Sequence, residues 1–202
     1  MYRKCIKRGL DFVLSLTAIV LLSPLFLALT VLGLVFMKGN PFFTQDRPGL
    51  REKIFKLVKF RTMTNAKGPD GELLPDEKRL IPYGKFLRAT SLDEIPELFN
   101  ILLGQMAIVG PRPLLTEYLP RYSAEQHRRH EVRPGLTGYA QAHGRNAVSW
   151  QERFRMDVWY VDHVSFRTDF GILLATVRGV LKHEGISSET SATMEKFMGN
   201  DT

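Results

Sequence analysis

The amino-acid sequence predicts a mainly α protein with a few short strands, an α+β fold that begins with a segment able to enter a membrane. The first observation is that residues 12–37 contain no charged side chain. The second is that apolar residues recur at helical spacing in several later segments, whereas strand-like alternation is confined to two short ones. We therefore expect two parts, a membrane hairpin over residues 1–38 and a compact domain over residues 39–202.

The uncharged run is long enough to cross a bilayer but carries a proline near its middle. A straight helix over it would reach roughly 39 Å, against roughly 30 Å of hydrocarbon. Ser23 and Pro24 predict a kink or break, because proline lacks a backbone donor and its ring opposes the carbonyl four residues back. Each remaining arm is too short to span the membrane alone.

Basic residues flank the run on both sides, and the positive-inside rule draws such flanks toward the cytoplasm. They are Arg3, Lys4, Lys7 and Arg8 before it, and Lys38, Arg47, Arg51, Lys53, Lys56 and Lys59 after it. A re-entrant helix-break-helix satisfies both flanks, and it is the topology we expect. The alternative is an ordinary tilted transmembrane helix with a tolerated proline kink.

The elements of the second part follow in order. We expect short strands at residues 42–44 and 54–63, separated by a turn at 47–50, and then a loop over 65–77. The spacing of apolar residues predicts an amphipathic helix over 92–103 that ends before Gly104. Further helices are expected at 115–122, 149–164 and 169–184, the last closed by Gly185.

The segment 149–164 is the candidate for an amphipathic helix at the membrane interface. It carries Trp159 beside Phe154 and Val158, with Arg153 and Arg155 nearby. Tryptophan favours the headgroup depth, which suits an interfacial helix. Simple packing of the same side on the core is an equal alternative.

Charge and cysteine content narrow the function classes. The chain has 28 Lys and Arg against 21 Asp and Glu, a net charge of +7, so an anionic partner is expected. Nucleic acid, phosphorylated substrates and acidic lipid all qualify, but the apolar run and the lack of a basic aromatic motif argue against nucleic acid. Cys5 is the only cysteine, which excludes a disulfide framework and any cysteine-based metal cluster.

Two adjacent carboxylates form the strongest chemical signal. Ser91 and Glu94 have the spacing of a capping box, so we expect Asp93 and Glu94 in the first turn of the helix over 92–103. An ionised carboxylate can attack phosphorus, and its neighbour can hold a divalent ion that bridges a diphosphate. The alternative is that both acids merely cap the helix, and Pro96 qualifies the boundary because it leaves one carbonyl unpaired.

Basic residues in stiff loops supply candidate phosphate ligands. Arg112 stands between Pro111 and Pro113, so its guanidinium is presented by a backbone with little freedom. Arginine binds phosphate through two parallel hydrogen bonds. Further basic residues next to turn formers or in a predicted strand are Arg133, Arg145, Lys59 and Arg61. Residues 127–130, His-Arg-Arg-His, have no recognised metal-ligand spacing, and we interpret them as a solvated basic face.

Taken together, these segments resemble the monotopic bacterial phosphoglycosyl transferases, which transfer a sugar phosphate to a polyprenyl phosphate at the start of surface-glycan assembly. The segments are Lys7-Arg8 before the apolar run with Ser23-Pro24, FTQDRPG at 43–49, KFRTM at 59–63, SLDEIPEL at 91–98, VGPRP at 109–113 and RPGLTG at 133–138. The likeness covers nearly the whole chain. It is greatest to the small enzymes that handle diacetamidobacillosamine phosphate in protein glycosylation, partly because of residues 191–200.

The resemblance implies a two-step reaction. Asp93 matches the nucleophile that attacks the β-phosphorus of a UDP-sugar, and Glu94 matches the second member of the dyad. The family's ion is Mg²⁺, which implies a metal site at these two carboxylates. Positions that match the family's basic and acidic residues near the phosphates are Lys59, Arg88, Arg112, Arg133, Arg145 and Asp157.

The family likeness also implies a location and partners. The catalytic domain is expected at the cytoplasmic face of the bacterial inner membrane, held by a re-entrant helix and by anionic lipid. The expected partners are a UDP-sugar and undecaprenyl phosphate, with downstream glycosyltransferases as further candidates. Two rivals stay open: a hexose-1-phosphate transferase that uses UDP-glucose or UDP-galactose, and a non-catalytic membrane-anchored scaffold.

Overall fold

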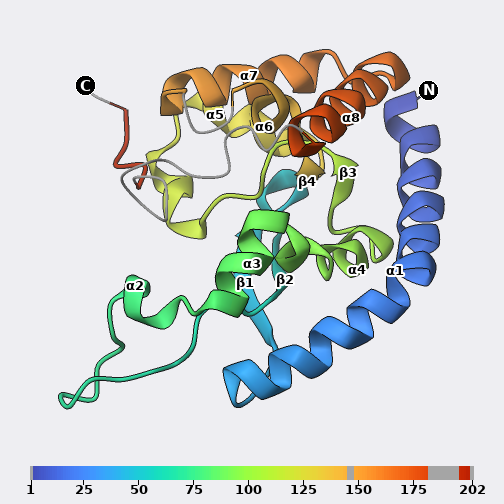
Figure 1. Cartoon of the computed structure of the whole chain (residues 1–202). Coiled ribbons are helices and arrows are strands. Elements are labelled where there is room, and N and C mark those ends of the chain that lie inside the picture. The colour runs from blue at the N-terminus through green and yellow to red at the C-terminus, as the bar shows by residue number, and fades with distance from the viewer. Residues whose placement is uncertain (1, 145–147, 182–195, 201–202) are drawn as a thin grey trace.

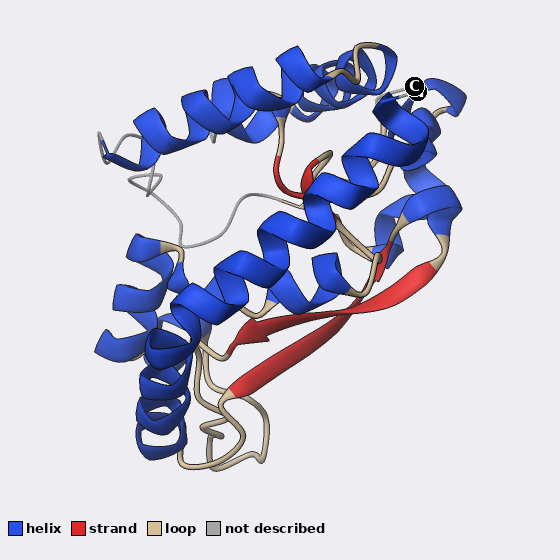
Figure 2. Cartoon of the chain, turned by 90° about the vertical axis from the view of Figure 1, so that its right-hand side faces the viewer, coloured by secondary structure: helices blue, strands red, loops and turns tan. Residues whose placement is uncertain are grey.

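The computed structural model describes residues 2–144, 148–181 and 196–200. Helices dominate this part of the chain, with short strands between them (Figures 1 and 2), which confirms the predicted fold class. The α-helices are α1 (Lys7–Met37), α2 (Asp76–Arg79), α3 (Pro82–Thr90), α4 (Glu97–Leu102), α5 (Ala124–His127), α6 (Tyr139–His143), α7 (Trp150–Asp162) and α8 (Phe166–Leu181). A π-helix and four short 3₁₀ helices complete the helical set: η1 (Tyr2–Ile6), η2 (Leu50–Glu52), η3 (Leu92–Glu94), η4 (Thr116–Arg121) and η5 (Arg128–Glu131).

Four strands form two separate pairs. β1 (Phe42–Pro48) and β2 (Ile54–Phe60) make an antiparallel hairpin in which Phe42 faces Phe60. β3 (Ala107–Val109) and β4 (Gly135–Thr137) pair in parallel, although 25 residues separate them along the chain. The second pair brings the loop after β3 next to the loop before β4, and this contact shapes one side of the site described below.

Helix α1 is continuous through Pro24, yet it changes direction along its length (Figure 1). Pro24 has no N–H to donate to the carbonyl of Val20, which would normally accept from this position. The Ser23 hydroxyl donates to that same carbonyl at 2.8 Å, so the acceptor keeps a partner. The predicted break in the helix is therefore wrong, whereas the bend agrees with the predicted kink. The helix stays continuous because Ser23 replaces the donor that Pro24 removes.

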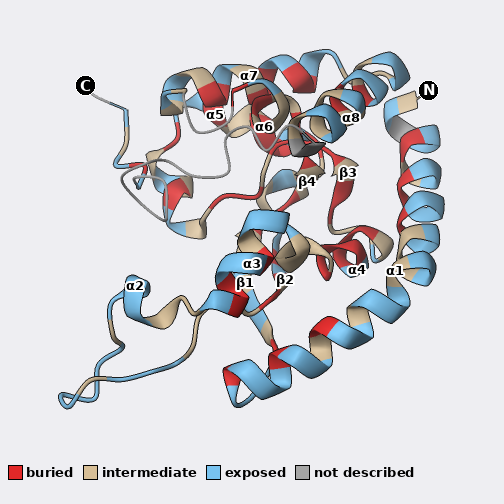
Figure 3. Cartoon of the chain, in the orientation of Figure 1, coloured by how far each residue is buried: buried red, intermediate tan, exposed pale blue. Residues whose placement is uncertain are grey.

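Most of the apolar surface of α1 faces outward (Figure 3). It is the one helix in the described part of the chain that is long and apolar enough to cross a membrane, with a mean hydropathy of 2.6 and 11% of that stretch buried. This is consistent with a membrane anchor.

The two arms of α1 hold the rest of the molecule by different interactions. In the first arm, Lys7 pairs with Asp169 of α8 at 2.7 Å, and Arg8 donates to the carbonyls of Ile101 and Leu102 at the end of α4. In the second arm, Phe26 packs against aromatic rings of the β1–β2 hairpin and α4: Phe42, Phe60 and Phe99. Helix α1 is thus bonded directly to the elements that surround the site.

Several predicted boundaries differ from the structure. The first strand extends to Pro48 and the second ends at Phe60. The segment 115–122 contains the 3₁₀ helix η4 in place of the expected α-helix. Helix α8 starts at Phe166, and Gly185 lies outside the described residues. Helix α3 and the β3–β4 pair were not predicted, since three-residue strands carry too little alternation to be recognised.

Helix α7 decides between the two interpretations of segment 149–164 for one side of the helix only. It buries Phe154, Val158 and Val161 against the core, while Trp159 remains 39% exposed on another side. Ser149 caps the helix by accepting from the backbone N–H of Glu152. The apolar side of this helix therefore packs on the core, and contact with a membrane stays a prediction for its exposed side.

Candidate active site

The two adjacent carboxylates lie in the 3₁₀ turn η3, between helices α3 and α4. The predicted capping box is wrong: Ser91 has a φ of 55°, ends α3, and caps nothing with its side chain. Pro96 is the physical reason, because it has no N–H to give to Leu92, so the regular helix starts only at Glu97. Asp93 and Glu94 are therefore held by a tight turn rather than by a helix N-terminus.

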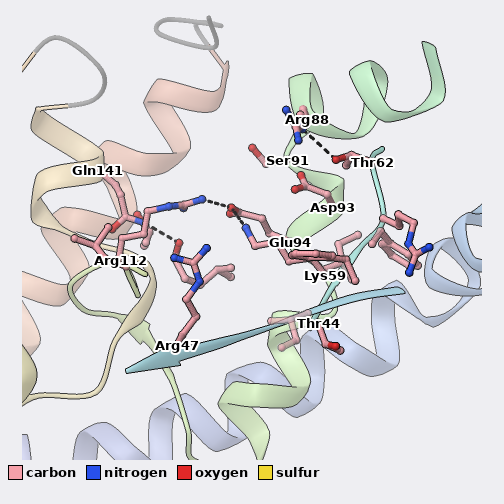
Figure 4. Close-up of a pocket in the computed structure, with 18 of the residues that line it drawn as sticks. Thr44, Arg47, Lys59, Thr62, Arg88, Ser91, Asp93, Glu94, Arg112 and Gln141 are labelled. Carbon is pink, nitrogen blue, oxygen red and sulfur yellow. Dashed lines mark hydrogen bonds and ion pairs between the residues drawn. The ribbon is translucent and has the colours of Figure 1, made fainter. Parts of the chain in front are cut away.

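Both carboxylates line an open cavity of about 1290 Å³ that extends from α1 to α8. Figure 4 shows Asp93 and Glu94 beside Lys59 and below Arg88, with Arg112 reaching toward them from the opposite side. Three elements supply these side chains: strand β2, the α3–η3 segment and the loop after β3.

Glu94 is fixed by two cations. Its Oε1 accepts from Lys59 Nζ at 2.7 Å and from Arg112 Nη2 at 2.7 Å. Burial alone would raise the pKa of Glu94, but Arg112 and Lys59 outweigh it and lower the pKa to about 2. Glu94 therefore stays ionised at neutral pH, and one of its oxygens is fully engaged.

A third acid stands behind this pair. Glu97 is 3% exposed, and its Oε1 lies 3.0 Å from Lys59 Nζ. Burial raises the pKa of Glu97 to about 7, although Lys59 pulls it down. Lys59 thus sits between two carboxylates, which fixes its ammonium group at the cavity wall.

Asp93 differs from Glu94 in having no hydrogen bond or ion pair with any side chain in the described part of the chain. Burial raises the pKa of Asp93, and the neighbouring Glu94 adds to the effect. Arg88 is close enough to oppose this shift, and its Nε donates to Thr62 Oγ1 at 3.1 Å. The carboxylate oxygens of Asp93 are therefore available to a reactant in the cavity.

The structure brings together some of the residues predicted for the site and separates others. Lys59, Arg88 and Arg112 line the cavity with the dyad. Arg133 is not among the described lining residues; its Nε donates to the Gly104 carbonyl at 2.9 Å, beneath the end of α4. Arg145 lies outside the described residues.

Asp157 is also not among the described lining residues of the cavity, and it affects the site through Arg129. It is 2% exposed and accepts from Arg129 Nη2 at 2.8 Å. Arg129 in turn donates to the carbonyl oxygen of Arg112 at 2.7 Å. The buried pair therefore supports the backbone that presents Arg112.

Residues 127–130 are not the solvated basic face that the sequence suggests. Arg129 and His130 are buried, while Arg128 and His127 pair with acids nearer the surface. The counter-charge for Arg129 comes from Asp157 in a different helix, so no local pattern could reveal it. The sequence placed Arg47 only among the basic residues that flank the apolar run and did not single out Glu97, although both belong to the segments that carry the family likeness.

The residues present fit a divalent ion in part. Among the described residues, no group of three or more His, Cys, Asp and Glu side chains is placed to hold a metal. Asp93 and Glu94 still offer carboxylate oxygens on one cavity wall. Mg²⁺ suits such a site, since it commonly uses one or two carboxylates and takes its other oxygens from water and substrate phosphates.

Comparisons with known proteins identify the class of protein. Residues 2–183 match the family described as bacterial sugar transferase. A sugar transferase of Bacillus subtilis, EpsL, is 55% identical over 163 residues, which is 80% of this chain and 81% of that protein. The chain belongs to the bacterial sugar transferase family, and its predicted enzyme class, a sugar-1-phosphate transferase, is confirmed.

Two longer relatives carry more specific names. The undecaprenyl-phosphate galactose phosphotransferase of Salmonella typhimurium is 35% identical over 198 residues, 89% of this chain and 41% of that protein. The UDP-glucose:undecaprenyl-phosphate glucose-1-phosphate transferase of Klebsiella pneumoniae is 35% identical over 181 residues, 85% of this chain and 39% of that protein. The chain thus spans about two fifths of the length of these two relatives.

Proposed function

We propose that this protein transfers a sugar-1-phosphate from a UDP-sugar to polyprenyl phosphate through a covalent intermediate on Asp93. In the first step, a carboxylate oxygen of Asp93 bonds to the β-phosphorus, the bond to the bridging oxygen breaks, and UMP leaves with the electron pair. In the second step, an oxygen of polyprenyl phosphate attacks the same phosphorus and releases the Asp93 carboxylate. The product is a polyprenyl-diphosphate sugar.

The observation that supports Asp93 as the nucleophile is that the two neighbouring carboxylates differ in their hydrogen-bond partners. Glu94 has an oxygen held by Lys59 and Arg112 at 2.7 Å each, which makes it a weak nucleophile. Asp93 has no such partner among the described side chains, and burial makes its oxygens more basic. A more basic carboxylate is the better nucleophile toward phosphorus.

The positions of the remaining cations in the cavity indicate their roles. Lys59, Arg88 and Arg112 surround the dyad, so they can balance the charge of a diphosphate while Asp93 approaches it. Mg²⁺, held by Asp93 and Glu94, would supply further charge neutralisation when bound. Glu94 then serves to position the cations and the metal.

Two classes of donor are candidates for the sugar, a diacetamido sugar and a hexose. The likeness to the bacillosamine enzymes favours UDP-N,N′-diacetylbacillosamine and a role in protein glycosylation. The names of the relatives from Salmonella and Klebsiella favour UDP-galactose or UDP-glucose. A panel of UDP-sugars distinguishes the two.

Intact-protein mass spectrometry tests the mechanism directly. The purified protein is mixed with Mg²⁺ and each UDP-sugar in the absence of lipid acceptor, beside Asp93→Asn and the control Asp70→Asn in the exposed loop. We expect a mass increase of one sugar-phosphate in the parent and the control but not in Asp93→Asn, with release of UMP. UMP release that requires polyprenyl phosphate and leaves no adduct would contradict a covalent step on Asp93.

The membrane arrangement is part of the same proposal. A nucleotide sugar dissolves in water and a polyprenyl phosphate in lipid, so the shared carboxylate belongs at the cytoplasmic surface of the inner membrane. The bend in α1 and the basic residues on both flanks support a re-entrant anchor with both ends on that side. Cysteines at residues 2 and 40, with Cys5 removed, should both be labelled from the cytoplasmic side; labelling from opposite sides would establish a crossing helix.

A further inference from the structure

The cavity continues past the dyad on the far side of Arg112. Its wall there comes from elements that meet only in the folded molecule: strand β1, the loop before η4, η4 itself and the start of α7. The side chains on this part of the wall are Arg47, Leu114, Leu115, Tyr118, Trp150 and Arg153. None of them has a part in the chemistry proposed for Asp93.

Arg47 carries a positive charge that no acidic side chain in the described part of the chain pairs with directly. Arg47 donates to the Pro113 carbonyl at 3.2 Å and to Gln45 Oε1 at 2.6 Å, and both acceptors are neutral. Its Nε is buried without an acceptor in the described part of the chain. Burial, together with the positive charge of Arg112, lowers the pKa of Arg47 to about 10. An anion placed here would relieve both effects.

An aromatic surface lies beside the arginines. The rings of Tyr118 and Trp150 meet edge to face, with centroids 5.7 Å apart, and Arg153 Cζ lies 5.4 Å from the centre of the Trp150 ring. The indole Nε1 of Trp150 is buried and finds no acceptor among the described residues. The wall thus combines flat apolar surface, guanidinium groups and a buried N–H donor that lacks a partner.

We propose that this region, the subsite formed by Arg47, Tyr118, Trp150 and Arg153, binds the nucleoside monophosphate half of the donor. The phosphate next to the ribose lies on Arg47 and Arg153, and the base lies along Tyr118 and Trp150. The inference rests on the proposed function and adds where the leaving group is held.

The position of Arg112 favours a donor that extends from the dyad toward Arg47. Its Nη2 contacts Glu94 at the dyad, and its own position borders the Arg47 side of the cavity (Figure 4). A diphosphate with its β-phosphorus at Asp93 can therefore extend past Arg112 and place its α-phosphate on Arg47. The part of the wall that α1 supplies is apolar, with Ala18 and Leu22, and it suits a hydrocarbon chain. Arg79, at the other end of the cavity, already pairs with Asp76 at 3.3 Å.

The subsite would also stabilise the negative charge that develops on UMP as it leaves. The leaving phosphate gains negative charge as the bond to the β-phosphorus breaks. Guanidinium groups already in place stabilise that charge without reorganisation, which lowers the barrier.

The test is a calorimetric titration of UMP into the full-length, detergent-purified protein. The variants are Arg47→Gln, Arg153→Gln and Trp150→Phe, and the matched control is Arg79→Gln, an arginine that lines the other end of the same cavity. We expect each of the two subsite arginine variants to weaken UMP binding by about tenfold or more, the usual loss for a charged hydrogen bond. Trp150→Phe keeps an aromatic side chain but removes the N–H donor together with one of the two fused rings, and should weaken binding by about threefold.

Two outcomes would overturn the subsite. In the first, UMP binds the parent and all three subsite variants equally while Arg79→Gln weakens it, which would place the nucleotide at the opposite end. In the second, UMP affinity is unchanged and a short prenyl phosphate binds the arginine variants more weakly, which would assign the arginines to the acceptor. Since Trp150→Phe keeps an aromatic side chain and changes no charge, it provides a second test of the subsite if an arginine variant does not fold.

Failure of the subsite is distinct from failure of the proposed function. If the parent releases UMP from a UDP-sugar and binds UMP, the reaction stands and only the placement of the nucleotide is at issue. If the parent releases no UMP from any UDP-sugar, the proposed reaction itself is wrong.

Discussion

Two walls of the same cavity are built in opposite ways. The carboxylate wall consists of Lys59, Asp93 and Glu94, with Glu97 behind Lys59, and the three acids lie within five consecutive residues. The arginine wall consists of Arg47, Arg112 and Arg153, supported from behind by Arg129 and Asp157. Its members come from separate parts of the chain and depend on contacts between distant elements. A local turn is thus enough to place the acids, whereas the arginines require the whole fold.

The arginine wall depends first on the close approach of two backbones. Gly110 precedes Arg112 by two residues, and its N–H donates to the Thr137 carbonyl at 2.8 Å. A Cβ at position 110 would lie 2.3 Å from the Arg133 carbonyl oxygen and 2.9 Å from the Gly135 nitrogen. Both obstacles are backbone atoms, so neither can rotate away.

Gly110→Ala should therefore give the largest effect. Strands β3 and β4 must separate to admit the methyl group, and we expect a loss of about 5 kcal/mol in the free energy of unfolding. The control is Gly171→Ala in α8, where an added Cβ meets nothing within 4 Å. That change should be neutral or stabilise by up to about 1 kcal/mol, because alanine favours a helix. Denaturant unfolding measures both, and equal stability of the two variants would contradict the dependence on β3–β4.

The two walls also differ in how far the sequence could predict them. Asp93 and Glu94 stand out because two acids are adjacent, and Lys59 and Arg112 because stiff or alternating segments present them. Arg128 and Arg129 look alike in the sequence, yet the side chain of one is 34% exposed and that of the other 2%. The difference arises from Asp157, 28 residues later, which only the packing of α7 brings into contact. Distant ion pairs of this kind leave no periodic signal.

Asp157→Asn tests the ion pair that supports the arginine wall. The change leaves the Arg129 guanidinium buried without a counter-charge, and we expect a loss of about 3 kcal/mol in the free energy of unfolding. Arg129 would also hold the Arg112 carbonyl less firmly, so the Michaelis constant for the UDP-sugar should rise. Glu152→Gln is the control, since it breaks an exposed pair with Arg155 on the same helix. Such surface pairs contribute little, and parent-like stability is expected there. Similar losses in both variants would mean that the buried pair has no special role.

On the carboxylate wall, the expected effect is smaller and depends on pH. Burial raises the pKa of Glu97 to about 7, while Lys59 and Arg112 lower that of Glu94 to about 2. Both groups have ordinary values near 4.5 in the unfolded chain. A raised pKa favours folding below the unfolded value and loses this contribution as pH rises through about 7. A lowered pKa does the reverse, so the contribution of Glu94 is present above about 4.5 and lost as pH falls toward 2.

Glu97→Gln should therefore gain stability relative to the parent between about pH 4.5 and 7, by on the order of 1 kcal/mol, because glutamine has no proton to lose. Glu94→Gln should show the opposite slope, with its deficit greatest near neutral pH and smallest in acid. Unfolding free energies of the three proteins, measured at several pH values between about 3 and 8, give the two slopes. Slopes of the same sign would show that Glu94 and Glu97 share one environment, and would contradict the division of Lys59 between two unlike acids. Opposite slopes would show that Lys59 keeps an ionised partner in Glu94 while Glu97 ionises only near neutral pH, so that its ammonium group stays fixed at the cavity wall across the range measured.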